Sequence, residues 1–249
     1  MYDMRWIVFV VFTLLSSWVF SQETVLNEAN IALQNKDFKK ALDLYMSIEN
    51  GHNGGSGMFK NMAIAAAGSG QDEKAILYYE KALKYTPNSK TIQKDLFILR
   101  KRNPLLDEPV PALLPVKIFN QITGIFNSET WTVVSLIFLI MGCFVILFGY
   151  PFRSFTRKHW IILIASSVLF LLTFLFAWYR YQQIYQNKGM IVMSPNIVMK
   201  KSPDASSPEV NSLPPGSKVY KKDQIADWYL VTIENGDTGW IPVPAAKKI

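Results

Sequence analysis

Two long apolar runs limit most strongly what this chain can fold into. They extend from Trp131 to Tyr150 and from Trp160 to Tyr179, and neither contains a charged residue. About 20 helical residues cross the ~30 Å hydrocarbon core of a bilayer, and soluble core helices of that length rarely lack a charge. Each run begins with Trp and ends with Tyr, whose rings favour the membrane–water interface. We therefore predict two transmembrane helices, over residues 131–150 and 160–179, rather than a pair of buried core helices.

The N-terminal segment predicts export. About fourteen mostly apolar residues follow Arg5, too few to span a bilayer, and small Ser21 suits a signal-peptidase site. We interpret residues 1–21 as a signal peptide. An uncleaved anchor is the alternative, and either one exports the chain that follows. No cysteine stands at the cleavage point, which excludes a lipoprotein anchor.

The segment between the apolar runs predicts the topology. Residues 151–159 contain Arg153, Arg157 and Lys158 but no acid, as expected of a short cytoplasmic loop. Arg180, just after the second run, is a weaker signal of the opposite sense. We predict a multi-pass protein of the inner (cytoplasmic) membrane with both soluble parts on the periplasmic side.

Residues 22–102 contain a repeat with a period of 34 residues. The matching pairs are Ala29 and Ala63, Ala32 and Ala66, Ala41 and Ala75, Leu42 and Ile76, and Tyr45 and Tyr79. This is the period of the tetratricopeptide repeat, a pair of antiparallel helices, and the sequence resembles that family. In the second copy, Gly70 suits the turn between the helices and Pro87 ends the second helix.

The first copy departs from the family pattern. Phe38 replaces the usual turn tyrosine, and a Gly-rich stretch over residues 50–57 replaces the closing proline. That stretch follows a helix and lacks the Lys-Ser/Thr of a phosphate loop, so we interpret it as a flexible connection. Residues 88–102 predict a third element, a capping helix with Ile92, Leu96 and Leu99 on its apolar face.

The resemblance to tetratricopeptide repeats implies a concave face that binds peptides or proteins. By that resemblance the face is lined by the first helix of each repeat, where the amides and the lysine suit a peptide backbone or a terminal carboxylate. The matching residues are Asn27, Asn30, Lys60, Asn61 and Ile64. A solvated helix face is the alternative for each of them.

Residues 103–130 connect the repeats to the first apolar run. Residues 103–116 contain four prolines and predict an extended, semi-rigid linker. Between Lys117 and Asn127, helical spacing gathers five apolar residues on one face, which indicates a short amphipathic helix on the outer membrane surface. They are Ile118, Phe119, Ile122, Ile125 and Phe126. An ordinary loop is the alternative.

Residues 189–249 change to short Val-, Ile- and Trp-rich runs separated by Pro, Gly and Asp turns, which predicts a small all-β barrel. The segments Gly216-Ser-Lys-Val219, Asp227-Trp-Tyr229 and Gly239-Trp-Ile241 resemble the bacterial SH3 family, and Gly236 suits a hairpin turn. Such modules bind wall glycopeptides or proteins, or act as spacers. We expect Trp228 and Trp240 to pack the barrel and Tyr220 and Tyr229 to lie on its surface.

The composition excludes several classes of function. Cys143 is the only cysteine and there are two histidines, so neither a disulfide framework nor a Cys-based zinc site can form within the chain. The sequence contains no recognisable catalytic set or nucleotide loop, and the apolar runs carry no ionisable residue for an ion path. The excess positive charge flanks the apolar runs instead of forming a nucleic-acid patch. We expect no enzyme, metal, cofactor or nucleic-acid partner.

The order of the parts resembles the BatE-type proteins of the Bacteroides aerotolerance (Bat) family along nearly the whole chain. Local echoes are Asn127-Ser-Glu-Thr-Trp131 before the first span and Ile191-Val-Met-Ser194 at the start of the barrel. The fold class expected is a multidomain membrane protein with an all-α tetratricopeptide array, two transmembrane helices and a small SH3-like barrel. The resemblance implies a non-enzymatic component that works beside von Willebrand factor A domain Bat proteins and a MoxR-type ATPase, in aerotolerance or envelope stress. An envelope scaffold is the first hypothesis, a peptidoglycan-binding sensor the second, and an enzyme a distant third.

Overall fold

The computed structural model describes residues 24–49, 54–103, 106, 113–149 and 156–249. The chain divides into two compact units. One contains most of the N-terminal helices and the C-terminal β-sheet, and the other comprises residues 84–89 and 110–187. The predicted signal peptide lies outside the described residues, as does most of the predicted cytoplasmic loop.

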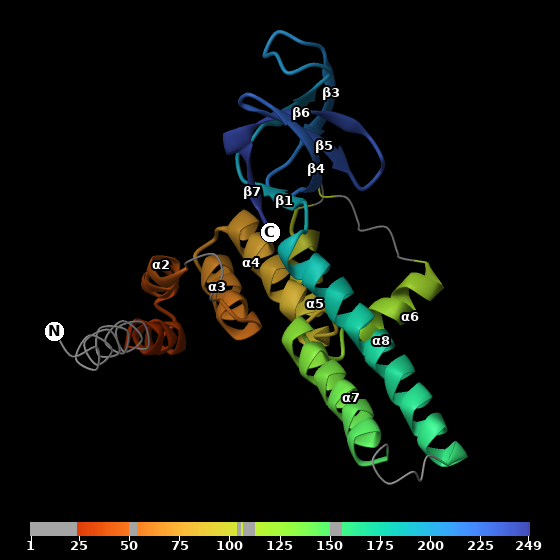
Figure 1. Ribbon diagram of the computed structural model, residues 1–249. Helices are drawn as coiled ribbons and strands as arrows, with labels where there is room; N and C mark the ends of the chain where they lie inside the picture. Colours follow the sequence, from red (N-terminus) through yellow and green to blue (C-terminus); the bar gives the residue numbers. More distant parts are fainter. Residues whose placement is uncertain (1–23, 50–53, 104–105, 107–112, 150–155) are drawn as a thin grey trace, which may run out of the picture. The chain divides into compact units, whose positions relative to one another are not determined.

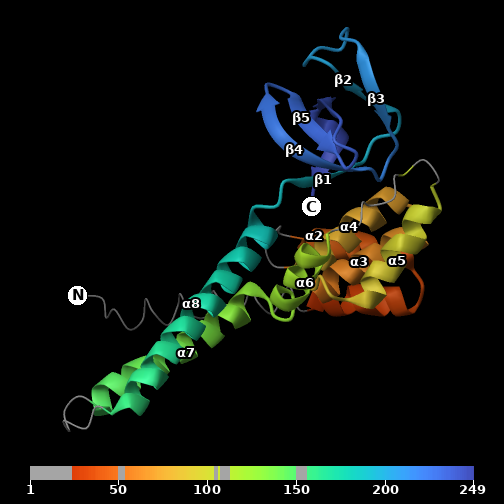
Figure 2. The same cartoon turned by 90° about the vertical axis from the view of Figure 1, so that its right-hand side faces the viewer.

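The N-terminal part is a series of antiparallel helices (Figure 2). A helix over residues 24–34 is followed by α2 (Phe38–Ile48), α3 (Ser56–Gly68), α4 (Asp72–Tyr85) and α5 (Lys90–Lys101). All ten residues of the five pairs with the 34-residue spacing are buried, so equivalent sequence positions occupy equivalent packing positions. The helix predicted over residues 88–102 is present as α5, and its predicted apolar residues Ile92, Leu96 and Leu99 are buried. The helix α3 begins at Ser56, inside the stretch expected to be a flexible connection.

Gly70 makes the turn between α3 and α4 as predicted. Its φ is +73°, a left-handed conformation that glycine adopts without steric cost. The Gln71 N–H donates to the Ala66 carbonyl across the turn at 2.9 Å, which satisfies one of the free carbonyl groups at the end of α3. The turn brings α4 back along α3, and the Ser56 hydroxyl donates to the Ala82 carbonyl.

Packing of α2 on α3 depends on Gly68, and this gives a testable prediction. A Cβ at Gly68 would lie 2.4 Å from Cγ of Phe38, near the base of the ring, where rotation cannot relieve the contact. We expect Gly68→Ala to lower the free energy of unfolding by about 1–3 kcal/mol, as other overpacked sites do. The measurement is urea unfolding of the full chain followed by pulse proteolysis.

Gly57→Ala is the matched control, because it lies in the same helix and a Cβ there meets nothing within 4 Å. Alanine is the better helix former by about 0.5–1 kcal/mol, so the control should be neutral or stabilising. Equal effects of the two substitutions would contradict the close packing at Phe38.

The second unit contains α6 (Leu114–Thr123), α7 (Ser128–Gly149) and α8 (Arg157–Tyr185). Both α7 and α8 are long and apolar enough to cross a membrane, and they lie side by side (Figure 1). Their contact includes a close approach, because a Cβ on Gly142 would lie 3.0 Å from the Ser166 hydroxyl oxygen. Large apolar side chains along both helices are exposed.

The bounds of α8 correct the predicted loop and span. The helix starts at Arg157, so the last three residues of the predicted loop are helical, and a capping box between Thr156 and His159 closes its N-terminus. At the other end α8 continues six residues beyond Tyr179. Arg180, the weaker topology signal, is buried and donates from Nη2 to the Lys84 carbonyl at 2.7 Å. That hydrogen bond satisfies a carbonyl at the C-terminal end of α4.

The amphipathic segment before the first span is helical as expected, but α6 begins three residues before Lys117 and ends at Thr123. Phe119 packs edge-on against Tyr179 of α8, with ring centroids 4.9 Å apart. Trp131, which we expected at the membrane interface, is 8% exposed and donates from its indole to the Thr123 carbonyl at 2.9 Å. The five apolar residues that defined the segment remain exposed on α6 and the two residues after Gly124.

The C-terminal part is one antiparallel sheet in the order β3-β2-β6-β5-β4-β1-β7. Its strands are β1 (Gly189–Val192), β2 (Ile197–Lys200), β3 (Glu209–Leu213), β4 (Lys218–Ile225), β5 (Trp228–Ile233), β6 (Thr238–Pro242) and β7 (Ala246–Lys248). Gly236 has φ +97° in the hairpin between β5 and β6, as the turn sequence predicts. The sequence did not indicate β3 or β7, which are rich in polar or charged residues.

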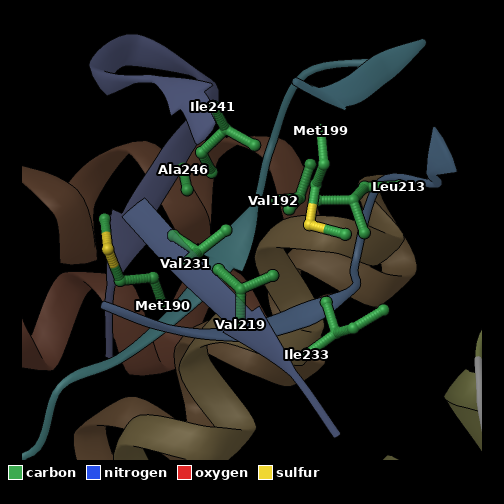
Figure 3. Packing of buried hydrophobic residues seen from close by; sticks show 9 residues of the cluster. All are labelled: Met190, Val192, Met199, Leu213, Val219, Val231, Ile233, Ile241 and Ala246. Carbon is green, nitrogen blue, oxygen red and sulfur yellow. The ribbon is translucent and has the colours of Figure 1, made fainter. Parts of the chain in front are cut away.

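The sheet encloses a cluster of aliphatic and methionine side chains (Figure 3). Val219, Val231 and Ile241 are fully buried at its centre. Trp228 and Trp240 are only half-buried and do not belong to the cluster, whereas Tyr229 packs against it. The two tryptophans, expected to pack the barrel, therefore lie outside its central cluster, which Val, Ile, Leu, Met and Ala side chains fill.

Candidate functional site

Two of the predicted groove residues meet on neighbouring helices. The Asn30 side-chain oxygen accepts hydrogen bonds from the Tyr45 hydroxyl at 2.6 Å and from the Asn61 amide nitrogen at 3.2 Å. Asn30 lies on the helix over residues 24–34, Tyr45 on α2 and Asn61 on α3. These two hydrogen bonds therefore link the helix over residues 24–34, which is the first helix of the first copy, to α3, the first helix of the second copy.

The amide pair retains unused hydrogen-bonding capacity. Within the described part of the chain, the Asn30 amide nitrogen and the Asn61 amide oxygen have no partner. Both residues are half-buried. One free donor beside one free acceptor matches the C=O and N–H of an extended peptide, the pattern that strand-like ligands present.

The other predicted residues flank this amide pair. Asn27 is exposed one turn before Asn30. Lys60 and Ile64 are half-buried on α3 and lie four residues apart, so they share a face of that helix. Lys60 has no ion pair with any described residue and supplies a positive charge beside the amides. The structure therefore brings only Asn30 and Asn61 of the predicted residues into contact, and the other three lie on the same two helices.

Burial holds Tyr45 in the neutral form that donates to Asn30. Removal of the hydroxyl from water raises the pKa of Tyr45, and its hydrogen-bonding neighbour Asn61 lowers that pKa by less. Tyr45 therefore remains a hydrogen-bond donor over the physiological pH range, and the orientation of the Asn30 amide is fixed.

A second cluster at the repeats is internally satisfied. Glu49 accepts from the Tyr78 hydroxyl at 3.0 Å and pairs with Lys81, whose ammonium lies 5.4 Å from the Phe59 and Tyr78 ring centroids. Burial first, and then the negative charge of Glu49, raises the pKa of Tyr78. The cluster joins the end of α2 to α3 and α4 and leaves little capacity for a ligand, so we interpret it as structural.

Glu80 is the centre of an ion network that the sequence did not indicate. Its carboxylate accepts from Arg100 of α5 and from Lys218 of β4, at 2.7 Å each. Burial alone lowers the pKa of Lys218, but the charge of Glu80 and its hydrogen bond outweigh that effect, so the pKa is raised. One buried carboxylate thus bridges two cations from distant parts of the sequence.

A cavity of about 180 Å³ lies beside this network. Its wall is mostly polar and includes Arg100 and Lys218 together with backbone and side chains from the ends of β3, β4 and β5. Gly216, with φ +91°, lines it where a side chain would be strained. Both cations pair with the single Glu80 carboxylate, so one positive charge of the two remains uncompensated beside the cavity.

Lysine side chains cover the predicted tyrosine surface of the sheet. The Lys221 ammonium lies 4.3 Å from the Tyr229 ring centroid, and the Lys218 ammonium lies 5.8 Å from that of Tyr220. Both rings are half-buried. Each ammonium lies over one face of its ring, so a sugar that stacked on that face would have to displace the lysine.

No group of three or more His, Cys, Asp or Glu side chains arranged to hold a metal ion is found among the described residues. Cys143 is exposed on α7 with a free thiol. Compared with known proteins, the sequence matches no protein-family model and no characterised protein.

Proposed function

We propose that this protein is a non-enzymatic scaffold of the bacterial envelope whose helical repeats dock an extended segment of a partner protein. The observation that carries the proposal is the half-buried Asn30–Asn61 pair, which presents a free donor and a free acceptor beside Lys60. Neither free atom is among the fully buried side-chain atoms without a partner, so both are accessible to a ligand. A pair whose orientation is fixed by Tyr45 and whose free atoms are accessible suits a peptide backbone as its ligand.

The whole-chain resemblance suggests which proteins the scaffold serves. The order of helical repeats, two apolar helices and a β module is that of BatE-type proteins, so we propose von Willebrand factor A domain Bat proteins as partners. The β module contributes a second docking surface in this proposal. Peptidoglycan remains the alternative ligand of that module, although Lys221 already covers the Tyr229 ring.

The proposed location is the inner membrane, with both soluble parts in the periplasm. Its support is the length and apolar character of α7 and α8 and the exposure of their large side chains, which only lipid or another helix can cover at low cost. Arg157 and Lys158 at the start of α8 fit the cytoplasmic side.

Protease added to intact spheroplasts tests the topology. We expect cleavage within residues 22–130 and within 189–249, and no cleavage of a tag inserted at residue 154 unless the cells are lysed. A matched sample opened by detergent shows that all sites are cleavable. Protection of either soluble part in intact cells would contradict the proposed topology.

Partner capture tests the docking function. We expect Asn61→Ala to reduce partner recovery about tenfold, because it removes one of the two amides while Tyr45 still satisfies Asn30. The measurement is quantitative mass spectrometry of proteins that co-purify with the tagged full chain from native membranes in mild detergent.

Asn35→Ala is the matched control, since Asn35 is an exposed amide in the turn after the first helix. It should recover the same partners as the unmodified chain. Equal recovery by Asn61→Ala, or the absence of any stoichiometric partner of the unmodified chain, would reject the docking function.

A further inference from the structure

The hairpin of α7 and α8 carries an open groove near one end. The groove has a volume of about 410 Å³ and a mostly apolar wall. The start of α7 contributes Ser128, Glu129 and Thr132, and the last three turns of α8 contribute Phe174, Ala177, Trp178, Tyr181 and Tyr185. All of these residues belong to the same compact unit.

The wall from α8 is rich in exposed aromatic rings. Trp178 is 57% exposed and Tyr181 is 47% exposed, and the rings of Tyr181 and Tyr185 lie 4.7 Å apart. The spacing from Trp178 to Tyr181 to Tyr185 keeps the three side chains on one face of the helix. Trp and Tyr faces attract ammonium groups, most strongly where water is excluded.

The wall from α7 supplies the one acidic group of the hairpin. Glu129 is the only acidic residue in α7 and α8, it is exposed, and it forms no ion pair within the described residues. Its place in the first turn puts it at the positive end of the α7 helix dipole. A carboxylate beside aromatic faces is complementary to a positively charged group.

The position of the groove relative to the bilayer indicates which molecule supplies the positively charged group. The groove lies at the α8 end that follows the apolar run, so in the proposed topology it opens at the outer boundary of the bilayer. Phospholipids are abundant at this depth, and some of them combine an ammonium headgroup with apolar acyl chains. Phe174, one turn deeper than Trp178, continues the apolar wall toward the membrane interior.

We propose that this groove binds a phospholipid with a primary ammonium headgroup, with the ammonium between Glu129 and the rings of Trp178 and Tyr181 and an acyl chain along Phe174. The site rests on the proposed membrane location but not on the docking function of the repeats. Charge complementarity distinguishes this occupant from the helix of a partner protein, which would leave the Glu129 carboxylate unpaired.

Native mass spectrometry of the delipidated full chain tests the site. The protein in mild detergent is offered phosphatidylethanolamine or phosphatidylglycerol with identical acyl chains. We expect the unmodified chain to retain the ethanolamine lipid about fivefold more than the glycerol lipid, the scale of a cation–π contact with a carboxylate partner. Glu129→Gln, which keeps size and helix, and Trp178→Leu should each reduce the ratio to near one.

Trp160→Leu is the matched control, because Trp160 has the same 57% exposure at the opposite end of α8. It should keep the fivefold ratio. Equal retention of both lipids by the unmodified chain, or an equal loss in the Trp160 and Trp178 variants, would overturn the site. The site would also be overturned if Trp178→Leu released a bound membrane protein and left the lipid ratio unchanged. A chain that stays soluble without detergent and binds neither lipid would instead refute the membrane location itself.

Discussion

Glu80→Gln is expected to lower the free energy of unfolding by about 3 kcal/mol, since loss of one member of a buried ion network leaves the others uncompensated. Here the remaining members are Arg100 and Lys218, each 2.7 Å from a different oxygen of the same carboxylate. A glutamine side chain offers one acceptor oxygen without charge, so at least one cation loses its partner. Urea unfolding of the full chain, followed by pulse proteolysis, measures the change.

Glu73→Gln on the same helix is the control, because Glu73 belongs to no ion pair within the described residues. It should change stability by less than about 0.5 kcal/mol, as ordinary surface substitutions do. Similar effects of the two substitutions would show that the Glu80 network contributes no more than a surface pair.

The same network predicts a dependence on pH. The folded-state pKa of Lys218 lies above its ordinary value of 10.5, so the protonated form is stabilised by folding. Its contribution is complete below pH 10.5 and is lost as the pH rises through the folded-state pKa. The difference in unfolding free energy between the unmodified chain and Lys218→Met should therefore be constant at neutral pH and shrink in strong alkali. A difference that grows with rising pH would have the wrong sign.

Ile241→Ala should have an effect of similar size on the β-sheet. Ile241 is fully buried in the cluster that Figure 3 shows, and a buried aliphatic side chain cut to Ala costs about 2–5 kcal/mol. Trp240→Ala, one residue earlier, should cost less despite the larger side chain, because Trp240 is half-buried outside the cluster. Pulse proteolysis with detection of a C-terminal tag measures both variants.

Ile241 and Trp240 thus form a matched pair on β6. A larger loss of stability for Trp240→Ala than for Ile241→Ala would show that Trp240 packs in the core, and would contradict this prediction. An unfolding midpoint unaffected by Ile241→Ala would mean that the sheet contributes little to the transition that is measured.

The helical part was predictable because its repeat is periodic. Ala41 and Ala75, or Tyr45 and Tyr79, stand 34 residues apart and are all buried, since each residue packs against its own repeat and the next. Gly70 and Gly236 were predictable for a local reason, because their positive φ values exclude most other residues. Asn30 and Asn61 are 31 residues apart, so their hydrogen bond joins non-equivalent positions of the two copies.

The remaining features depend on contacts that no local pattern encodes. Glu80 and Lys218 are 138 residues apart, and neither residue stands out among the other charges of the chain. The edge strand β3 was missed because three of its five residues are polar or charged and only Leu213 is buried. Trp240 was misplaced because aromatic size suggests a core, whereas burial is decided by which face of β6 the side chain occupies.

The close approach of Gly142 to Ser166 has a mechanical consequence. At this point the two helices pack too closely to admit a Cβ on Gly142, so sliding of one helix along the other would first need them to separate there, and we expect α7 and α8 to bend and tilt as one unit. The Trp131 indole hydrogen-bonds the start of α7 to the Thr123 carbonyl of α6, so the end of α6 is expected to move with the hairpin. A force applied at one end of the hairpin is therefore transmitted to the other end, because α7 and α8 do not slide along each other.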